Sequence, residues 1–126
     1  MQATPMSPGE IRTIKIHAAT YDNATGVLLQ PGVTYQFRAA GTWCDASIEC
    51  GPDGHDAPRL RYFRWMRRSR PNHWFALIGR AGGQTFLIAS AATITPTEAG
   101  ELLCYANDVR FMYWNNKGSV TLTIVR

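Results

Sequence analysis

Apolar and polar residues alternate strictly in several short stretches of this 126-residue chain. In residues 119–124, Val120, Leu122 and Ile124 alternate with Ser and Thr, and residues 33–38 show the same pattern directly after a Pro-Gly turn. Alternation places every apolar side chain on one face of an extended strand, whereas a helix needs such residues three or four positions apart. No stretch keeps a helical period with caps. The pattern therefore predicts an all-β chain.

Other short strands are predicted from apolar runs bounded by turn residues. Residues 14–16 alternate, and residues 101–106 follow an Ala-Gly pair. Residues 74–78 and 85–89 flank a glycine-rich stretch at 79–83, an arrangement typical of a hairpin. About seven or eight short strands separated by turn signals indicate a β-sandwich.

The length of the chain is that of one domain with a core of its own. We expect residues 1–10 to be a flexible N-terminal leader and residues 11–126 to be a single β-sandwich domain. The first residues lack a basic and an apolar signal region, so we expect no signal peptide, and a protein that is cytoplasmic or released by a non-classical route. No apolar run approaches the roughly 20 residues of a membrane span, so we expect no membrane insertion.

The three cysteines cannot all pair with one another. Cys44 and Cys50 are close enough in sequence to form a loop disulfide, which would leave Cys104 free in a predicted strand. Because the chain shows no export signal, we expect all three thiols to be reduced and mostly buried. No Cys-x-x-Cys spacing or His cluster indicates a zinc site.

The positive charge is concentrated in one segment. Six of the eleven arginines lie between Arg59 and Arg70, where they alternate with aromatic residues. Such a mixture is found in proteins that bind single-stranded nucleic acid. It is also found in loops whose aromatic residues pack on the domain beneath arginine side chains, and at oligomer interfaces. The latter two interpretations are preferred, since no RNA-binding fold pattern accompanies the segment.

An Asp and a pair of Asn residues precede the last predicted strand. Asp108, Asn115 and Asn116 offer hard oxygen donors with little charge, which suit Ca²⁺ better than zinc or copper. A cation held by few carboxylates can take further oxygens from a ligand, and sugar hydroxyls are natural candidates. The alternative is that these side chains only bond their own backbone in turns.

Several motifs occur in one order along most of the chain. They are Asn-Asp-Val at 107–109, Asn-Asn-x-Gly-Ser at 115–119, and stretches at 29–32, 37–43, 51–54 and 76–79. In this order and spacing they resemble the PA-IL (LecA-like) family of calcium-dependent galactose-binding lectins. The resemblance is strongest at 107–119 and fails between Gly54 and Trp74.

The resemblance implies a jelly-roll-like, lectin-like β-sandwich of two antiparallel sheets, with one Ca²⁺ in a loop at its apex. It assigns the side chains of Asp108, Asn115 and Asn116 and the main-chain carbonyl of Met112 to the metal. One more donor would come from the loop after Trp43. Cys44, Asp45 and Ala46 are the candidates there, and Asp45 is preferred.

The resemblance also implies that two vicinal hydroxyls of a sugar complete the calcium shell. Sugar contacts would then come from Asp108, Val109, Met112 and Asn115. Galactose-binding members hold the exocyclic hydroxyl with a His and a Gln after Gly-Pro-x-Gly. This chain has His55 and Asp56 in that region but no His-x-x-Gln, and its loop is longer. His55 and Asp56 are therefore added to the sugar-binding candidates, and the choice of sugar stays open.

Two tryptophans lie beside these motifs. Trp43 precedes the candidate calcium loop and Trp114 precedes the Asn pair. Each would present an aromatic face to the C–H face of a sugar, or else pack in the core.

No nucleophile motif, phosphate-binding glycine loop or His-Glu-x-x-His is present, so we expect no enzyme activity. The expected partners are galactose-type sugars or glycoconjugates. Because a shallow sugar site binds with modest affinity, we expect a homo-oligomer that gains avidity from several sites. Two alternatives remain: a basic nucleic-acid-binding β-domain that uses residues 59–70, and a structural or adhesion module without a working site.

Overall fold

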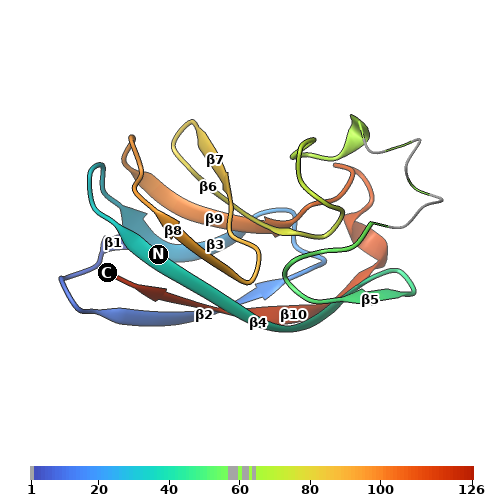
Figure 1. Ribbon diagram of the computed structural model, residues 1–126, viewed down its shortest axis with the longest axis horizontal. Helices are drawn as coiled ribbons and strands as arrows, with labels where there is room; N and C mark the ends of the chain where they lie inside the picture. Colours follow the sequence, from blue (N-terminus) through green and yellow to red (C-terminus); the bar gives the residue numbers. More distant parts are fainter. Residues whose placement is uncertain (1, 57–59, 61–62, 64) are drawn as a thin grey trace.

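The computed structural model describes residues 2–56, 60, 63 and 65–126, which form two sheets packed face to face (Figure 1). The first sheet has the strand order β1 (Thr4–Pro5), β3 (Asn23–Leu29), β9 (Gly100–Ala106), β6 (Leu77–Ala81) and β7 (Gln84–Leu87). The second has the order β2 (Ile11–His17), β10 (Asn116–Val125), β4 (Tyr35–Asp45) and β5 (Ile48–Cys50), and β8 (Ala91–Ile94) pairs with the other end of β4. All pairs are antiparallel except β1 with β3. The predicted all-β sandwich is confirmed.

The alternating stretches supply the core between the sheets. In β10, Val120, Leu122 and Ile124 are at most 1% exposed, and in β4 the same is true of Tyr35 and Phe37. Their partners from the opposite sheet include Val27, Leu29, Leu102 and Phe86. Since burial of apolar surface is the main force that drives folding, the period of two fixes which face of each strand turns inward.

The predicted hairpin is present, with shifted boundaries. β6 and β7 pair antiparallel from Ile78 with Leu87 to Ala81 with Gln84, so the strands run through most of the expected turn. Residues 74–76 precede the strand because Phe75 has a φ of 61° and its N–H donates to the Asn107 carbonyl at 2.8 Å. Their apolar side chains are buried without belonging to a strand.

Residues 4–10 are part of the sandwich, where the sequence predicted a flexible leader. Met6 is 1% exposed within the core, and the Gly9 N–H donates to the Arg126 carbonyl at 2.9 Å. The Arg12 guanidinium also donates to the carbonyls of Thr4 and Pro5 at 3.2 and 3.0 Å. Main-chain groups and one apolar side chain therefore attach the segment, and neither gives a periodic signal in so short a stretch.

All three cysteines are unpaired. Cys44 lies opposite Glu49 and Cys50 opposite Trp43, so the two thiols are offset by one position between β4 and β5. Cys104 is fully buried in the core, and burial raises its pKa well above the ordinary value of a thiol. None of the helices formed by the described residues has the length and apolar character needed to cross a membrane.

Candidate functional site

The segment between β9 and β10 lies at one end of the sandwich, and Asn107 fixes where it begins. Its side chain is fully buried and accepts a hydrogen bond from the Ser69 N–H at 2.8 Å. Its amide nitrogen donates to the carbonyls of Ser69, Asn72 and His73 at 2.8, 3.1 and 2.9 Å. The Asn107 side chain thus holds the loop at residues 69–73 against the start of this segment. These hydrogen bonds fix the main chain directly before Asp108.

Asp108 is 4% exposed and only half satisfied by the protein. Its Oδ1 accepts the Val109 N–H at 2.7 Å, whereas Oδ2 is buried without a hydrogen-bond partner. Burial raises the pKa of this carboxyl to about 6, and the negative charge of Asp45 acts in the same direction. The Val109 N–H, the Asn116 side chain and His55 lower it. Asp108 therefore combines an unused oxygen with a charge that the surrounding protein only partly stabilises.

The two asparagines contribute two more buried oxygens of the same kind. Asn115 ends the 3₁₀ helix η2 (Tyr113–Asn115), and Asn116 begins β10. The Asn116 amide nitrogen donates to the Ala18 carbonyl at 3.1 Å, which leaves its Oδ1 buried and unbonded. Asn115 Oδ1 is also buried and unbonded. Because a buried acceptor without a donor costs about 1–3 kcal/mol, three of them on these residues fit a site that receives a cation.

Asp45 and His55 stand beside these donors. Asp45 is the register partner of Asn116 across β4 and β10, and its Oδ2 lies 3.1 Å from His55 Nε2. Gly54 makes this placement possible, since it has a φ of 82° and an added Cβ would lie 2.2 Å from the Trp74 carbonyl oxygen. His55 therefore contacts the preferred metal candidate of its loop. Asp56 is exposed and does not line the pocket described next.

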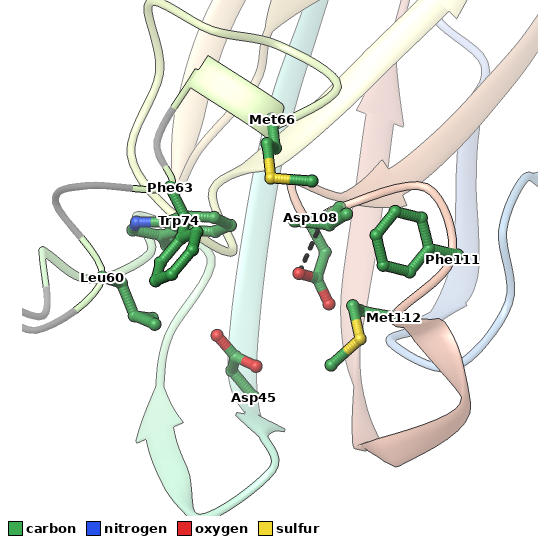
Figure 2. A pocket seen from close by; sticks show the side chains of 9 residues that line it. Asp45, Leu60, Phe63, Met66, Trp74, Asp108, Phe111 and Met112 are labelled. Carbon is green, nitrogen blue, oxygen red and sulfur yellow. Dashed lines mark hydrogen bonds between the residues drawn. The ribbon is translucent and has the colours of Figure 1, made fainter.

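A pocket of about 320 Å³ opens over the two carboxylates (Figure 2). Asp45 and Asp108 face it from opposite sides, with Met112 beside them. The rest of the lining is apolar and comes from Leu60, Phe63, Met66, Trp74, Val109 and Phe111. The structure thus combines oxygen donors with an apolar wall, an arrangement suited to a small ligand that carries both hydroxyls and C–H faces.

Four of the eight sequence-predicted site residues line this pocket, and Asn115 and Asp56 are not among them. Asp45, Asp108, Val109 and Met112 line it, Asn116 acts on the pKa of Asp108, and His55 contacts Asp45. Both hydrogen-bonding groups of the Val109 main chain already have protein partners, Asp108 Oδ1 and the Met112 N–H. The Val109 N–H is therefore not available to a ligand, whereas its carbonyl can accept one further hydrogen bond.

Sequence reasoning missed the apolar wall, and of the two alternatives for the tryptophans, core packing applies to Trp43 and neither applies to Trp114. Trp43 is fully buried in the core, and Trp114 is 78% exposed and does not line the pocket. Trp74 and Phe63 line it instead. The structural role of Asn107 was also missed, although the Asn-Asp-Val motif pointed to this residue. Its amide is fully buried, so Asn107 supports the fold, while Asp108 of the same motif is a candidate ligand.

Within the described residues, no group of three His, Cys, Asp or Glu side chains is placed to hold a metal ion. The candidate donors are instead two carboxylates and two side-chain amides. Amide and carboxylate oxygens suit a hard cation with flexible coordination, which is the behaviour of calcium.

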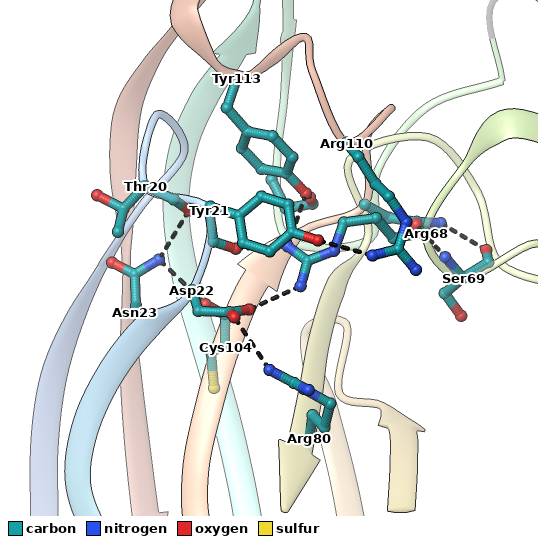
Figure 3. A network of polar contacts seen from close by, with 12 residues as sticks. Thr20, Tyr21, Asp22, Asn23, Arg68, Ser69, Arg80, Cys104, Arg110 and Tyr113 are labelled. Carbon is teal, nitrogen blue, oxygen red and sulfur yellow. Dashed lines mark hydrogen bonds and ion pairs between the residues drawn. The ribbon is translucent and has the colours of Figure 1, made fainter. Parts of the chain in front are cut away.

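The arginine-rich segment is partly structural (Figure 3). The side chain of Arg68 is 6% exposed and binds Asp22 with an Nη2–Oδ1 distance of 2.7 Å. Its guanidinium carbon lies 3.7 and 3.5 Å from the ring centroids of Tyr21 and Tyr105, and Nη1 donates to the Tyr113 hydroxyl at 3.2 Å. Arg68 therefore packs against tyrosines from other parts of the chain, whereas the described aromatic residues of its own segment, Phe63 and Trp65, are 52% and 62% exposed.

Arg67 and Arg70 continue this segment along the site. The Arg67 guanidinium lies 5.4 Å from the Trp74 ring centroid, and it donates to the Arg70 carbonyl at 2.6 Å. Arg67 also pairs with Val109 as an isolated β-bridge. The arginine-rich segment therefore contacts the main chain of the candidate site. Arg59, Arg61 and Arg64 lie outside the described residues.

The buried carboxyl of Asp108 predicts a pH-dependent stability in the presence of EDTA. Its pKa rises from 3.8 to about 6 in the fold, so the folded protein binds the proton more tightly than the unfolded chain. The contribution is fully present below about pH 4 and is lost as the pH rises through about 6, a loss of about 3 kcal/mol. Denaturant unfolding from pH 4 to 7 measures it.

Asp108→Asn removes this titration and should flatten the curve over that range. Asp53→Asn is the matched control, since Asp53 is exposed and its Oδ1 accepts the Ser90 N–H away from the pocket. An Asp108→Asn curve that keeps the full wild-type slope would assign the titration to another group.

Comparison with known proteins gives a likeness in structure only. No family model matches the sequence, and no curated protein matches it. Among solved structures, the chain matches a domain described as "EclA N-terminal domain; PllA-like lectin" with a TM-score of 0.72 and 18% sequence identity. The match covers 90% of this chain and 94% of that one. The chain therefore has the sandwich fold of that lectin domain, and the likeness does not single out the PA-IL family.

Proposed function

We propose that this chain is a calcium-dependent carbohydrate-binding protein. The observation that carries the proposal is the set of three buried, unbonded acceptor oxygens on Asp108, Asn115 and Asn116. All three are acceptor oxygens of the kind that a calcium ion takes as ligands. The fold that the chain shares with a lectin domain supports the same class of function.

The proposed metal ligands are the side chains of Asp108, Asn115, Asn116 and Asp45, with the main-chain carbonyl of Met112. Calcium bound there would supply a positive charge that attracts and polarises sugar hydroxyls. The protein would orient the sugar. Asp108 and Asn115 bond vicinal hydroxyls, and Phe63, which is 52% exposed, offers an aromatic face on the pocket wall. His55 positions Asp45 through their hydrogen bond.

Galactose-type sugars are the proposed ligands, on the sequence resemblance at residues 107–119. A sugar contact from Asp56 has less support than one from His55, because Asp56 is exposed and does not line the pocket. We further propose a homo-oligomer, because a small open site gains useful strength through several copies. The protein would act by binding, without a catalytic step.

Thermal unfolding tests the proposal. Calcium should raise the melting temperature, because a ligand that binds only the folded state stabilises it by mass action, about 2.7 kcal/mol at 100 times its dissociation constant. Galactose should raise the melting temperature further in calcium and leave it unchanged in EDTA.

Magnesium is the control cation, because its demand for short octahedral bonds suits a loose amide-rich site poorly. A melting temperature that ignores calcium would sink the proposal in favour of a structural module. Binding to single-stranded DNA that persists in EDTA and weakens steeply with salt would favour the nucleic-acid alternative.

A further inference from the structure

A second pocket of about 420 Å³ continues from the one over Asp45 and Asp108. The two share Met66, Val109 and Phe111 as a common wall. Beyond this wall the lining changes from carboxylate and apolar groups to Trp65 and four arginines: Arg67, Arg68, Arg70 and Arg110. A ligand that fills the first pocket and extends across Phe111 therefore enters a region of opposite charge.

None of the described residues that line the second pocket is acidic. Asp22 serves both Arg68 and Arg80, at 2.7 and 2.9 Å, so a single carboxylate is divided between two guanidinium groups. Arg110 donates to the Tyr21 hydroxyl at 2.8 Å, a neutral acceptor, and both Arg70 and Arg110 are exposed. Guanidinium groups gathered in this way attract an anion.

A third, smaller hollow extends the same cationic surface. Arg68 and Arg110 line it together with Arg80, whose Nε is buried without an acceptor. The polar contacts in Figure 3 show Arg68, Arg80 and Arg110 directed toward the Asp22 and Tyr21 region. The cationic surface thus includes a buried donor without an acceptor, Arg80 Nε.

We propose that the ligand is an acidic glycan, a galactose-type sugar that carries a sulfate or a carboxylate on itself or on the neighbouring sugar. Its hydroxyls occupy the Asp108 pocket, and its anionic group lies beside Arg70 and Arg110. Phe111, which the two pockets share, and Trp65, which lines the second, are 68% and 62% exposed and offer faces for the sugar rings. This inference rests on the proposed function and names the substrate class of the same site.

The charge pattern favours a glycan over a nucleic acid. Without calcium, the carboxylates of Asp45 and Asp108 line the pocket that adjoins the arginines and repel a chain that carries a phosphate at every residue. A glycan with neutral hydroxyls at one end and one anionic group at the other matches both regions. Sulfate and carboxylate are both anions with acceptor oxygens, and this is the feature that the arginines would recognise.

A glycan array with matched pairs tests the inference. Each pair has the same terminal galactose, with and without a sulfate or uronic carboxylate on that residue or the next, and is read in calcium and in EDTA. In calcium the acidic member should bind better. The double variant Arg70→Gln/Arg110→Gln should lower the ratio of acidic to neutral affinity by roughly three- to tenfold. Higher salt should lower the same ratio.

Lys15→Gln/Arg38→Gln is the matched control, since it removes two exposed positive charges from β2 and β4, outside both pockets. The inference fails alone if neutral and acidic glycans bind equally in calcium, or if the control lowers the ratio as much. If no glycan binds in calcium, the proposed function fails and the inference falls with it. Stronger binding of single-stranded DNA than of any acidic glycan, unaffected by EDTA, also overturns the inference.

Discussion

Asp108→Asn is expected to lower the affinity for calcium by roughly 100-fold, because it removes one of two carboxylates from a proposed site that is otherwise built of neutral donors. The Asn side chain keeps the shape of Asp and one carbonyl oxygen. The loss of calcium affinity therefore measures the contribution of the negative charge. Isothermal titration with calcium measures the affinity directly. The rise in melting temperature that we expect with calcium, and the further rise with galactose, should both disappear in the variant.

The same substitution should leave the metal-free fold intact or strengthen it. At pH 7 the wild-type carboxyl is ionised although burial raises its pKa to about 6, so in EDTA the charge opposes folding. Replacing it with a neutral amide removes that cost. A variant that is as stable as wild type in EDTA, yet fails to respond to calcium, separates binding from folding. Asp53→Asn carries the same change of charge at an exposed position and should titrate like wild type. Wild-type calcium affinity in Asp108→Asn would show that the metal site lies elsewhere.

The sheets were predictable where burial is one-sided. β10 and the first part of β4 have one face in the core and one outside, so their apolar residues alternate and the strand can be read from the chain. β1, β3, β5 and β8 were missed. β3 has the sequence Asn-Ala-Thr-Gly-Val-Leu-Leu and a register shift against β9 between Ala24 and Leu28. A bulge of this kind breaks the alternation on which the prediction depends.

The candidate site was partly predictable because its oxygen donors are close in sequence. Asp108, Asn115 and Asn116 belong to one short segment, and their residue types indicate a hard cation. Asp45 is more than 60 positions away in sequence and meets Asn116 only through the pairing of β4 with β10. The apolar wall comes from the stretch where the resemblance fails, so no pattern in the chain connected Phe63, Met66 and Trp74 with the donors.

The arginines between 59 and 70 show why residue type alone does not decide a role. Arg68 and Arg70 are two positions apart in the same basic run. One is enclosed by three tyrosines and an aspartate, and the other is exposed. The difference is set by Asp22 and Tyr21, which lie more than 40 positions earlier in the chain. Local sequence therefore carries no signal that separates a structural arginine from a free one.

Arg68→Met is accordingly expected to lower the free energy of unfolding by about 3 kcal/mol, which corresponds to a melting temperature about 10 °C lower. The substitution leaves Asp22 with Arg80 as its remaining ion-pair partner and removes the guanidinium from between the rings of Tyr21 and Tyr105. Denaturant unfolding in EDTA measures the loss without any contribution from a metal.

Arg70→Met is the matched control within the same loop, and it should change the free energy of unfolding by no more than about 0.5 kcal/mol, because its exposed side chain makes no buried contact. Arg68→Lys should fall between the two, since an ammonium keeps the charge opposite Asp22 but cannot reproduce the planar contact with the tyrosine rings. Equal stability of Arg68→Met and Arg70→Met would mean that the ion pair and the ring contacts do not hold this loop. The ordering Arg70→Met, Arg68→Lys, Arg68→Met, from least to most destabilised, would instead show that one buried cation anchors the arginine-rich segment against the sandwich. Its exposed neighbours Arg70 and Arg110 would then be free to meet a ligand.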